Sequence, residues 1–278
     1  GEYNFYADLF TDTNQDWGDL IYHDISIKGS WKFFPFTALL LDVNWQLRDY
    51  LDDSRGYYGE LTDSKPLRVR VGMNGFITRK LSVMAMVGWG YSFHDNWTLP
   101  DAAEEALLKK ETPNARDSFN SVIGEARVSF KFSPETIVQG GYECNFRDSL
   151  FSNYVAFHKA YLNFQQRIFQ RVDVEFDLAY HYMSYAQLPR TYLYNETRDV
   201  ITEILGRGYD RVDGMLVSQL GVKVDIARFV SFEALYRLEL LNDSLNSKAM
   251  FGVRYDNGSV DYMGYTRHLI LGTFVFRY

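Results

Sequence analysis

One stretch constrains the fold of this chain more than any other. Residues 171–185, RVDVEFDLAYHYMSY, carry Val, Phe, Leu and Tyr at even positions and mostly charged side chains at odd positions. A period of two is typical of a β-strand with one apolar and one polar face. Strands of soluble proteins are about five or six residues long, whereas a tilted strand needs about nine to eleven to cross a bilayer. The stretch therefore predicts a transmembrane strand between lipid and a polar lumen.

The composition agrees with this interpretation. Tyr and Phe number 21 each, and the net charge of −7 argues against a nucleic-acid partner. No run of eighteen apolar residues is present that could form a transmembrane helix. The single cysteine, Cys144, excludes an internal disulfide and a Cys-based metal site, and its parity predicts a lipid-facing position. The chain begins directly in a strand-like pattern, so we expect a mature or trimmed protein.

The same alternation predicts about twelve strands in one domain, residues 1–278. The expected ranges are 2–12, 20–33, 37–50, 66–78, 81–93, 121–132, 136–148, 153–168, 170–185, 211–226, 230–241 and a last strand ending at 278. Short and long connections alternate, as in barrels with short periplasmic turns and long extracellular loops. We expect an all-β, transmembrane, antiparallel up-and-down barrel in the bacterial outer membrane, with both termini periplasmic. A soluble sandwich, the alternative, would have shorter strands.

Local signals refine this picture. Good helix formers at 102–110 and 196–205, the second followed by Gly206, predict short helices inside two long loops. Asn257-Gly258 predicts a hairpin tip. Aromatic residues near strand ends predict interfacial girdles, namely Trp31, Trp45, Trp89, Tyr154, Tyr180 and Tyr182. Carbohydrate stacking is the alternative for the loop aromatics Tyr57, Tyr58, Trp97, Tyr192 and Tyr194.

The C-terminus, LILGTFVFRY, ends on an aromatic residue. Ile270, Gly272, Phe274, Phe276 and Tyr278 share the outward parity. This pattern resembles the C-terminal targeting strand of bacterial outer-membrane proteins, and the resemblance implies recognition by the barrel-assembly machinery. The small residue at Gly272 lies one place away from the strictest form of the signal. A twelve-stranded barrel with inward arginines also resembles the sugar-acid channels of enteric bacteria, although no motif of that family accompanies it.

The polar parity predicts the residues that face the lumen. Their signs are mixed, with a basic bias at Arg48, Arg68 and Arg70. Two interpretations remain open: cross-strand charge pairs that hold the barrel, or a pore whose arginines attract anionic solutes. The predicted pore-lining residues are Lys28, Arg48, Arg68, Arg70, Arg127, Glu143, Lys159, Arg167, Asp173, Glu175, Asp177, His181 and Arg237.

Catalysis is not expected. Barrel phospholipases have a histidine and a serine two residues apart on one outward face. The only such spacing in this sequence, Ser92 and His94, is on the inward parity, and His181 near Asp177 lacks a nucleophilic serine. The sequence shows no metal-ligand spacing and no glycine-rich phosphate loop, and we expect no cofactor. The favoured function is a narrow channel for small, anionic solutes. The alternative is a non-enzymatic structural or assembly barrel that holds protein partners through its loops. Outer-membrane lipid is the expected surrounding in either case.

Overall fold

The structure is a computed structural model, and it describes residues 1–9, 19–51, 63–94, 117–149, 153–186, 192–194, 201–204, 212–243 and 265–276. Twelve antiparallel strands follow one another in a single sheet, each bonded to the next in chain order. This confirms the predicted all-β, up-and-down architecture. The strands are β1 Glu2–Asp8, β2 Leu20–Phe34, β3 Thr37–Tyr50, β4 Ser64–Phe76, β5 Leu81–His94, β6 Asn120–Ser133, β7 Thr136–Asp148, β8 Tyr154–Ile168, β9 Val172–Tyr185, β12 Val212–Ala227, β13 Val230–Asp243 and β14 Tyr265–Phe276.

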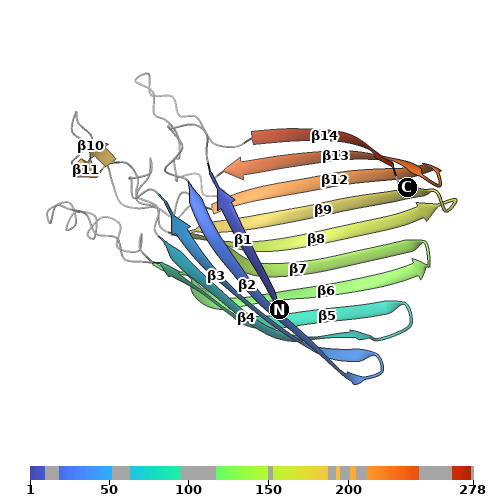
Figure 1. Ribbon diagram of the computed structural model, residues 1–278, viewed down its shortest axis with the longest axis horizontal. Helices are drawn as coiled ribbons and strands as arrows, with labels where there is room; N and C mark the ends of the chain where they lie inside the picture. Colours follow the sequence, from blue (N-terminus) through green and yellow to red (C-terminus); the bar gives the residue numbers. More distant parts are fainter. Residues whose placement is uncertain are drawn as a thin grey trace.

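The five short turns lie together at one end of the curled sheet, on the right in Figure 1. We call this the turn end, and the opposite end the loop end. The turns are 35–36, 77–80, 134–135, 169–171 and 228–229. Bulges that increase the local twist lie beside three of these turns, near Lys32, Lys131 and Asp225. In the turn between β8 and β9, Phe169 and Gln170 both have positive φ, 50° and 58°, as a type I′ hairpin requires.

The two faces of the sheet differ as the alternation predicts. On β4, Val69, Val71 and Met73 are exposed on the outer face, whereas the side chains of Arg68 and Arg70 are half-buried on the inner face. The same holds at the C-terminal strand, where Ile270, Phe274 and Phe276 are outward and 78%, 60% and 71% exposed. Apolar side chains on the outer face contact lipid favourably, and polar side chains line the interior. Hydrogen bonds between neighbouring strands pair the backbone N–H and C=O groups, which a bilayer cannot do.

One expectation from the sequence is wrong. The segment 196–205 was expected to be helical, but Ile201–Ile204 forms strand β11, which pairs antiparallel with β10, Tyr192–Tyr194. Its β-branched residues favour an extended backbone more than a helix. The expected helix at 102–110, the Asn257-Gly258 tip, the loop aromatics Tyr57, Tyr58 and Trp97, and Tyr278 lie outside the described residues. Within the described part of the chain, no helix is long and apolar enough to cross a membrane.

Strands β6 and β7 separate near the loop end. Their ladder stops at the Gly124–Cys144 pair, although β6 begins four residues earlier at Asn120 and β7 continues to Asp148. Over the same stretch β7 remains paired with β8 as far as Asp148–Tyr154. The loop-end part of β7 therefore has no ladder with β6 and is paired only with β8.

The aromatic ring of Phe146 shows where this free part of β7 goes. Phe146 is 1% exposed and stacks on Phe119 with ring centroids 4.2 Å apart, beside the fully buried Ile123. Gly90 on the inner face of β5 provides the space: a Cβ there would lie 2.5 Å from the Phe146 ring. The end of β7 thus packs over the inner face of β5 and β6 and narrows the interior.

Candidate functional site

The interior contains a cavity of about 610 Å³ that extends from the middle of the barrel toward the loop end. We call it the loop-end cavity. Seven Lys or Arg side chains and two carboxylates line it. The cations are Lys28, Arg48, Arg68, Arg70, Arg147, Lys159 and Arg237, and the carboxylates are Asp42 and Glu143. Strands on both sides of the sheet's curve contribute these residues, so the cavity lies inside the barrel.

Arg68 is the most tightly held of these cations. Its guanidinium donates to Asn44 Oδ1 at 3.1 Å and Asn145 Oδ1 at 3.3 Å, and to the carbonyl oxygen of Phe146 at 2.8 Å. The same group lies over the Phe146 ring, 4.3 Å from its centroid, a favourable cation–π geometry. These contacts join β3, β4 and β7 across the interior.

Arg48 and Arg70 each form an ion pair with an aspartate. Arg48 Nη1 lies 3.6 Å from Asp148 Oδ2, and Ser64 Oγ donates to the same carboxylate oxygen. Arg70 Nη2 lies 2.5 Å from Asp42 Oδ2. Substitution of either partner in a buried ion pair strongly destabilises the fold, because the remaining charge is left buried without a partner. The three arginines expected to attract solute therefore also brace the wall of the cavity.

Three other cations of the loop-end cavity have no such partner. No carboxylate of the described chain lies within ion-pair distance of Lys28, Arg147 or Lys159. Lys28 is directly opposite Asp42 in the ladder, but the Asp42 carboxylate accepts a hydrogen bond from Arg70 instead. Lys159 lies over the Tyr161 ring at 5.2 Å. Glu143, the ladder partner of Lys159, accepts a hydrogen bond from Asn145 at 3.2 Å. Within the described part of the chain, the cavity thus has positive charge that no ion pair neutralises.

A second cavity, of about 740 Å³, opens near the turn end, between β7–β9 and β12–β14. We call it the turn-end cavity. Its charged lining is acidic, with Glu135, Asp173, Glu175 and Glu233 against only Arg167 and Lys223. Both cations are paired there. Arg167 Nε lies 2.6 Å from Asp173 Oδ1, and Lys223 Nζ lies 2.7 Å from Glu233 Oε1.

The predicted pore-lining residues divide between these two cavities. Eight lie in the loop-end cavity: Lys28, Arg48, Arg68, Arg70, Glu143, Lys159, His181 and Arg237. Three lie in the turn-end cavity: Arg167, Asp173 and Glu175. The remaining two, Arg127 and Asp177, are on the inward parity but line neither cavity. Arg127 pairs in the ladder with Gly141 and Met84, and Asp177 accepts a hydrogen bond from Asn163 at 2.6 Å.

His181 does not form the base-and-orienter pair considered from the sequence. Its ladder partners are Lys159 on β8 and Met215 on β12, whereas Asp177 is bonded to Asn163. The described residues also contain no group of three His, Cys, Asp or Glu side chains that could hold a metal ion.

Several important residues did not stand out in the sequence. Asn44, Asn145 and Asp148 hold the arginines, yet each is an ordinary polar residue of its strand. Asp148 and Phe146 also lie on the nominally outward parity of β7. They reach the interior because β7 leaves β6 after Cys144. A pattern of period two carries no signal for such a separation.

The antiparallel twelve-stranded sheet, its apolar outer face and its charged interior together define the class of the protein: an outer-membrane β-barrel. No family model matches the chain, and no curated protein matches it.

Several solved structures are similar to the chain, among them two hydrocarbon channels and an import receptor. The TodX monoaromatic hydrocarbon channel deltaS2 mutant is 11% identical over 93% of this chain and 74% of that chain, with a TM-score of 0.46. The CymD monoaromatic hydrocarbon channel is 9% identical over 86% and 82%, with a TM-score of 0.38. The ferric-catecholate import receptor Fiu from E. coli K12, in its open form, is 10% identical over 92% and 49%, with a TM-score of 0.38. The twelve-stranded sheet and its two faces, rather than these similar structures, define the class of the protein.

Proposed function

We propose that this outer-membrane barrel is a channel for small solutes with a preference for anions. The observation that carries the proposal is the unneutralised charge of Lys28, Arg147 and Lys159 in the loop-end cavity. A cleft lined by one sign of charge concentrates counter-ions, and charged side chains around a pore set its ion selectivity.

The arginines and lysines have different roles in this proposal. Arg48, Arg68 and Arg70 are held by Asp148, by two asparagines and by Asp42, so they shape the cavity. Lys28 and Lys159 have flexible ammonium groups without a bound carboxylate, so they are the groups that meet a solute. The side chains that bridge β3 and β4 to β7 narrow the interior, which favours small solutes.

The orientation is part of the same proposal. In outer-membrane barrels the short turns are periplasmic and the longer loops extracellular. We therefore place the turn end in the periplasm, with both termini on that side, and the loop-end cavity toward the outside. The exposed outward row Ile270, Phe274 and Phe276 supports recognition of β14 by the barrel-assembly machinery during insertion.

Planar bilayers test the channel directly. Under a KCl gradient, the purified barrel should conduct, and its reversal potential should show chloride passing more readily than potassium. The double variant Lys28→Glu with Lys159→Glu should shift the preference to potassium, because both substitutions reverse the sign of unpaired groups in the loop-end cavity. Absence of conductance in the wild-type protein would refute the proposal, and conductance with unchanged selectivity in the variant would refute the role of the lysines.

A structural or assembly barrel is the second candidate, and one observation favours it. The Arg48–Asp148 pair and the Arg68 bonds to Asn145 and Phe146 cross the interior from β3 and β4 to β7. A barrel closed by such bridges would conduct nothing and would instead hold partners outside the strands. Silent bilayers together with a stoichiometric co-purifying protein would support this candidate over the channel.

A further inference from the structure

Three of the five histidines lie on the outer face of the barrel, and each is hydrogen-bonded to a tyrosine of the neighbouring strand. The tyrosine hydroxyl and histidine Nδ1 are 2.7, 2.5 and 2.9 Å apart in the three pairs. The pairs are Tyr3–His23 on β1 and β2, Tyr142–His158 on β7 and β8, and Tyr236–His268 on β13 and β14.

The three pairs share one geometry. In each, the two residues are diagonal neighbours on the sheet: the ladder pairs Tyr3 with Ile25, for example, and His23 with Phe5. His23 lies three residues from the loop-end residue of its strand, His158 four and His268 three. The pairs therefore recur at a similar depth below the loop end, and we call them the Tyr–His belt.

Each ring of the belt has one nitrogen left for a further partner. The tyrosine occupies Nδ1, and the partner at one ring nitrogen determines the role of the other. No described residue forms a hydrogen bond with Nε2 of these three histidines. An unpaired polar group is costly in hydrocarbon, so a belt at this depth belongs at the level where lipid headgroups supply polar atoms.

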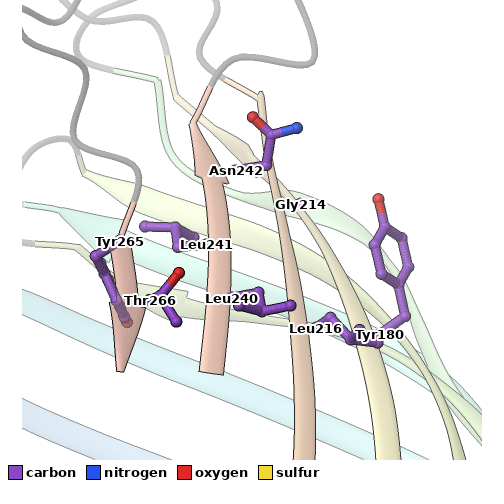
Figure 2. Close-up of a pocket in the computed structure, with 8 residues that line it drawn as sticks. All are labelled: Tyr180, Gly214, Leu216, Leu240, Leu241, Asn242, Tyr265 and Thr266. Atoms are coloured by element: carbon purple, nitrogen blue, oxygen red, sulfur yellow. The ribbon is translucent and has the colours of Figure 1, made fainter. Parts of the chain in front are cut away.

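A groove beside one pair gives a headgroup a place to lie. It has a volume of about 370 Å³ and lies at the loop end, across β9, β12, β13 and β14, where Tyr180, Leu216, Leu240 and Thr266 form a row of ladder partners on the outward parity. Figure 2 shows Leu240 and Leu216 between Thr266 and Tyr180. Thr266 is two residues before His268 on the same face of β14, so the groove leads from the Tyr236–His268 pair toward the aqueous side.

We propose that the Tyr–His belt binds the phosphate group of lipids in the surrounding leaflet. Phosphate oxygens accept hydrogen bonds from the histidine Nε2–H groups, which the tyrosine hydroxyls orient. At the Tyr236–His268 pair, the outer part of the headgroup lies in the groove, against the hydroxyl groups of Tyr180 and Thr266. This surface is on the lipid side of the wall, so the proposal does not depend on conduction through the lumen.

Native mass spectrometry of the purified barrel in a phosphate-free detergent tests the proposal. The probes are dimyristoyl phosphatidylglycerol, a galactolipid with the same acyl chains but no phosphate, and inorganic phosphate alone. Wild-type protein should retain the phosphatidylglycerol, and the triple variant H23F/H158F/H268F should retain at least tenfold less. The galactolipid should be bound weakly and equally by both proteins, and inorganic phosphate alone should produce no stable adduct.

Variants with matched chemistry separate recognition from folding. Phe132→Leu with Phe274→Leu changes two outward aromatics that are remote from the belt and should leave retention unchanged. H268Q keeps a hydrogen-bond donor and should retain lipid better than H268F, which also provides a single-site test if the triple variant does not fold. Equal retention of phosphatidylglycerol by wild type and the His→Phe variants would overturn the proposal, as would equal binding of the galactolipid.

Discussion

The two internal cavities are lined by the same kinds of charged residue but have opposite signs. In the turn-end cavity each cation is neutralised by a neighbouring carboxylate, and Glu135 and Glu175 remain. In the loop-end cavity Asp42 is already paired with Arg70 and Glu143 accepts a hydrogen bond from Asn145, whereas Lys28, Arg147 and Lys159 have no carboxylate of the described residues within ion-pair distance. The difference shows that the sign of a lumen depends on which charges are left after pairing, and that composition alone does not determine it.

The cavities also differ in how much of the fold depends on their pairs. The loop-end contacts connect strands that are distant in the sheet, such as β3 and β4 with β7. The turn-end pairs join adjacent strands, β8 with β9 and β12 with β13, which the ladders already hold. We therefore expect substitutions at the loop end to cost more stability than equivalent ones at the turn end.

Arg68→Ala should have the largest effect. It removes three hydrogen bonds and a cation–π contact, and it leaves Asn44 Oδ1, Asn145 Oδ1 and the Phe146 carbonyl with one partner fewer. Buried acceptors left unpaired cost about 1–3 kcal/mol each, so we expect a loss of about 3 kcal/mol in the free energy of unfolding. Urea unfolding in micelles measures it. A loss below about 1 kcal/mol, typical of an exposed pair, would contradict the bracing role.

Gly90→Ala should destabilise the barrel by about 1–3 kcal/mol, the usual cost of overpacking. The new methyl group would lie 2.5 Å from the Phe146 ring and 3.0 Å from Ile123. Gly29→Ala is the matched control, since its nearest neighbour, Leu41 Cβ, is at an ordinary 3.7 Å. Adding Phe146→Leu should recover part of the loss, and failure to do so would show that β7 does not pack against β5.

Glu175→Gln should raise the chloride preference of the channel a few-fold. Glu175 accepts hydrogen bonds from Asn163 and Gln165, and no cation of the described residues forms an ion pair with it. Neutralising Glu175 removes negative charge from the turn-end cavity. Since a tenfold change in selectivity corresponds to about 1.4 kcal/mol, a few-fold change corresponds to less. Reversal potentials measure the shift. A change toward potassium would contradict the assigned sign of this cavity.

Lys223→Ala should have the smallest effect, less than about 1 kcal/mol, because its pair with Glu233 is partly exposed and joins adjacent strands. The same urea titration applies. A loss as large as that of Arg68→Ala would remove the distinction between the two cavities.

The sequence predicts the strands well because successive side chains on a strand face lipid and the aqueous interior in turn, and this alternation is visible in the residue types. Val69 and Arg68, one residue apart, lie on opposite faces as the alternation requires. The expected helix over 196–205 is wrong because the β-branched residues of Ile201–Ile204 favour a strand over a helix.

The candidate site could be predicted only in part. Parity identifies Lys28 and Arg68 as inward. It cannot show that Arg68 is held by Asn145, 77 residues away, while Lys28 has no ion pair with any residue that the structure describes. Phe146 and Asp148 lie on the outward parity, and only the end of the β6–β7 ladder brings them inside. The Tyr–His belt likewise requires the register between strands, which the pattern along a single strand does not contain.

The central claim is that the two parities of each strand meet different solvents. Spin labels placed one at a time along β9, in a Cys144→Ser background in lipid bilayers, test it most directly. Dissolved oxygen should reach the labels best at Val174, Phe176 and Leu178, and a water-soluble nickel reagent should reach them best at Asp173, Glu175 and Asp177. If both reagents follow the same profile, or the two profiles are exchanged, the membrane-spanning barrel is contradicted.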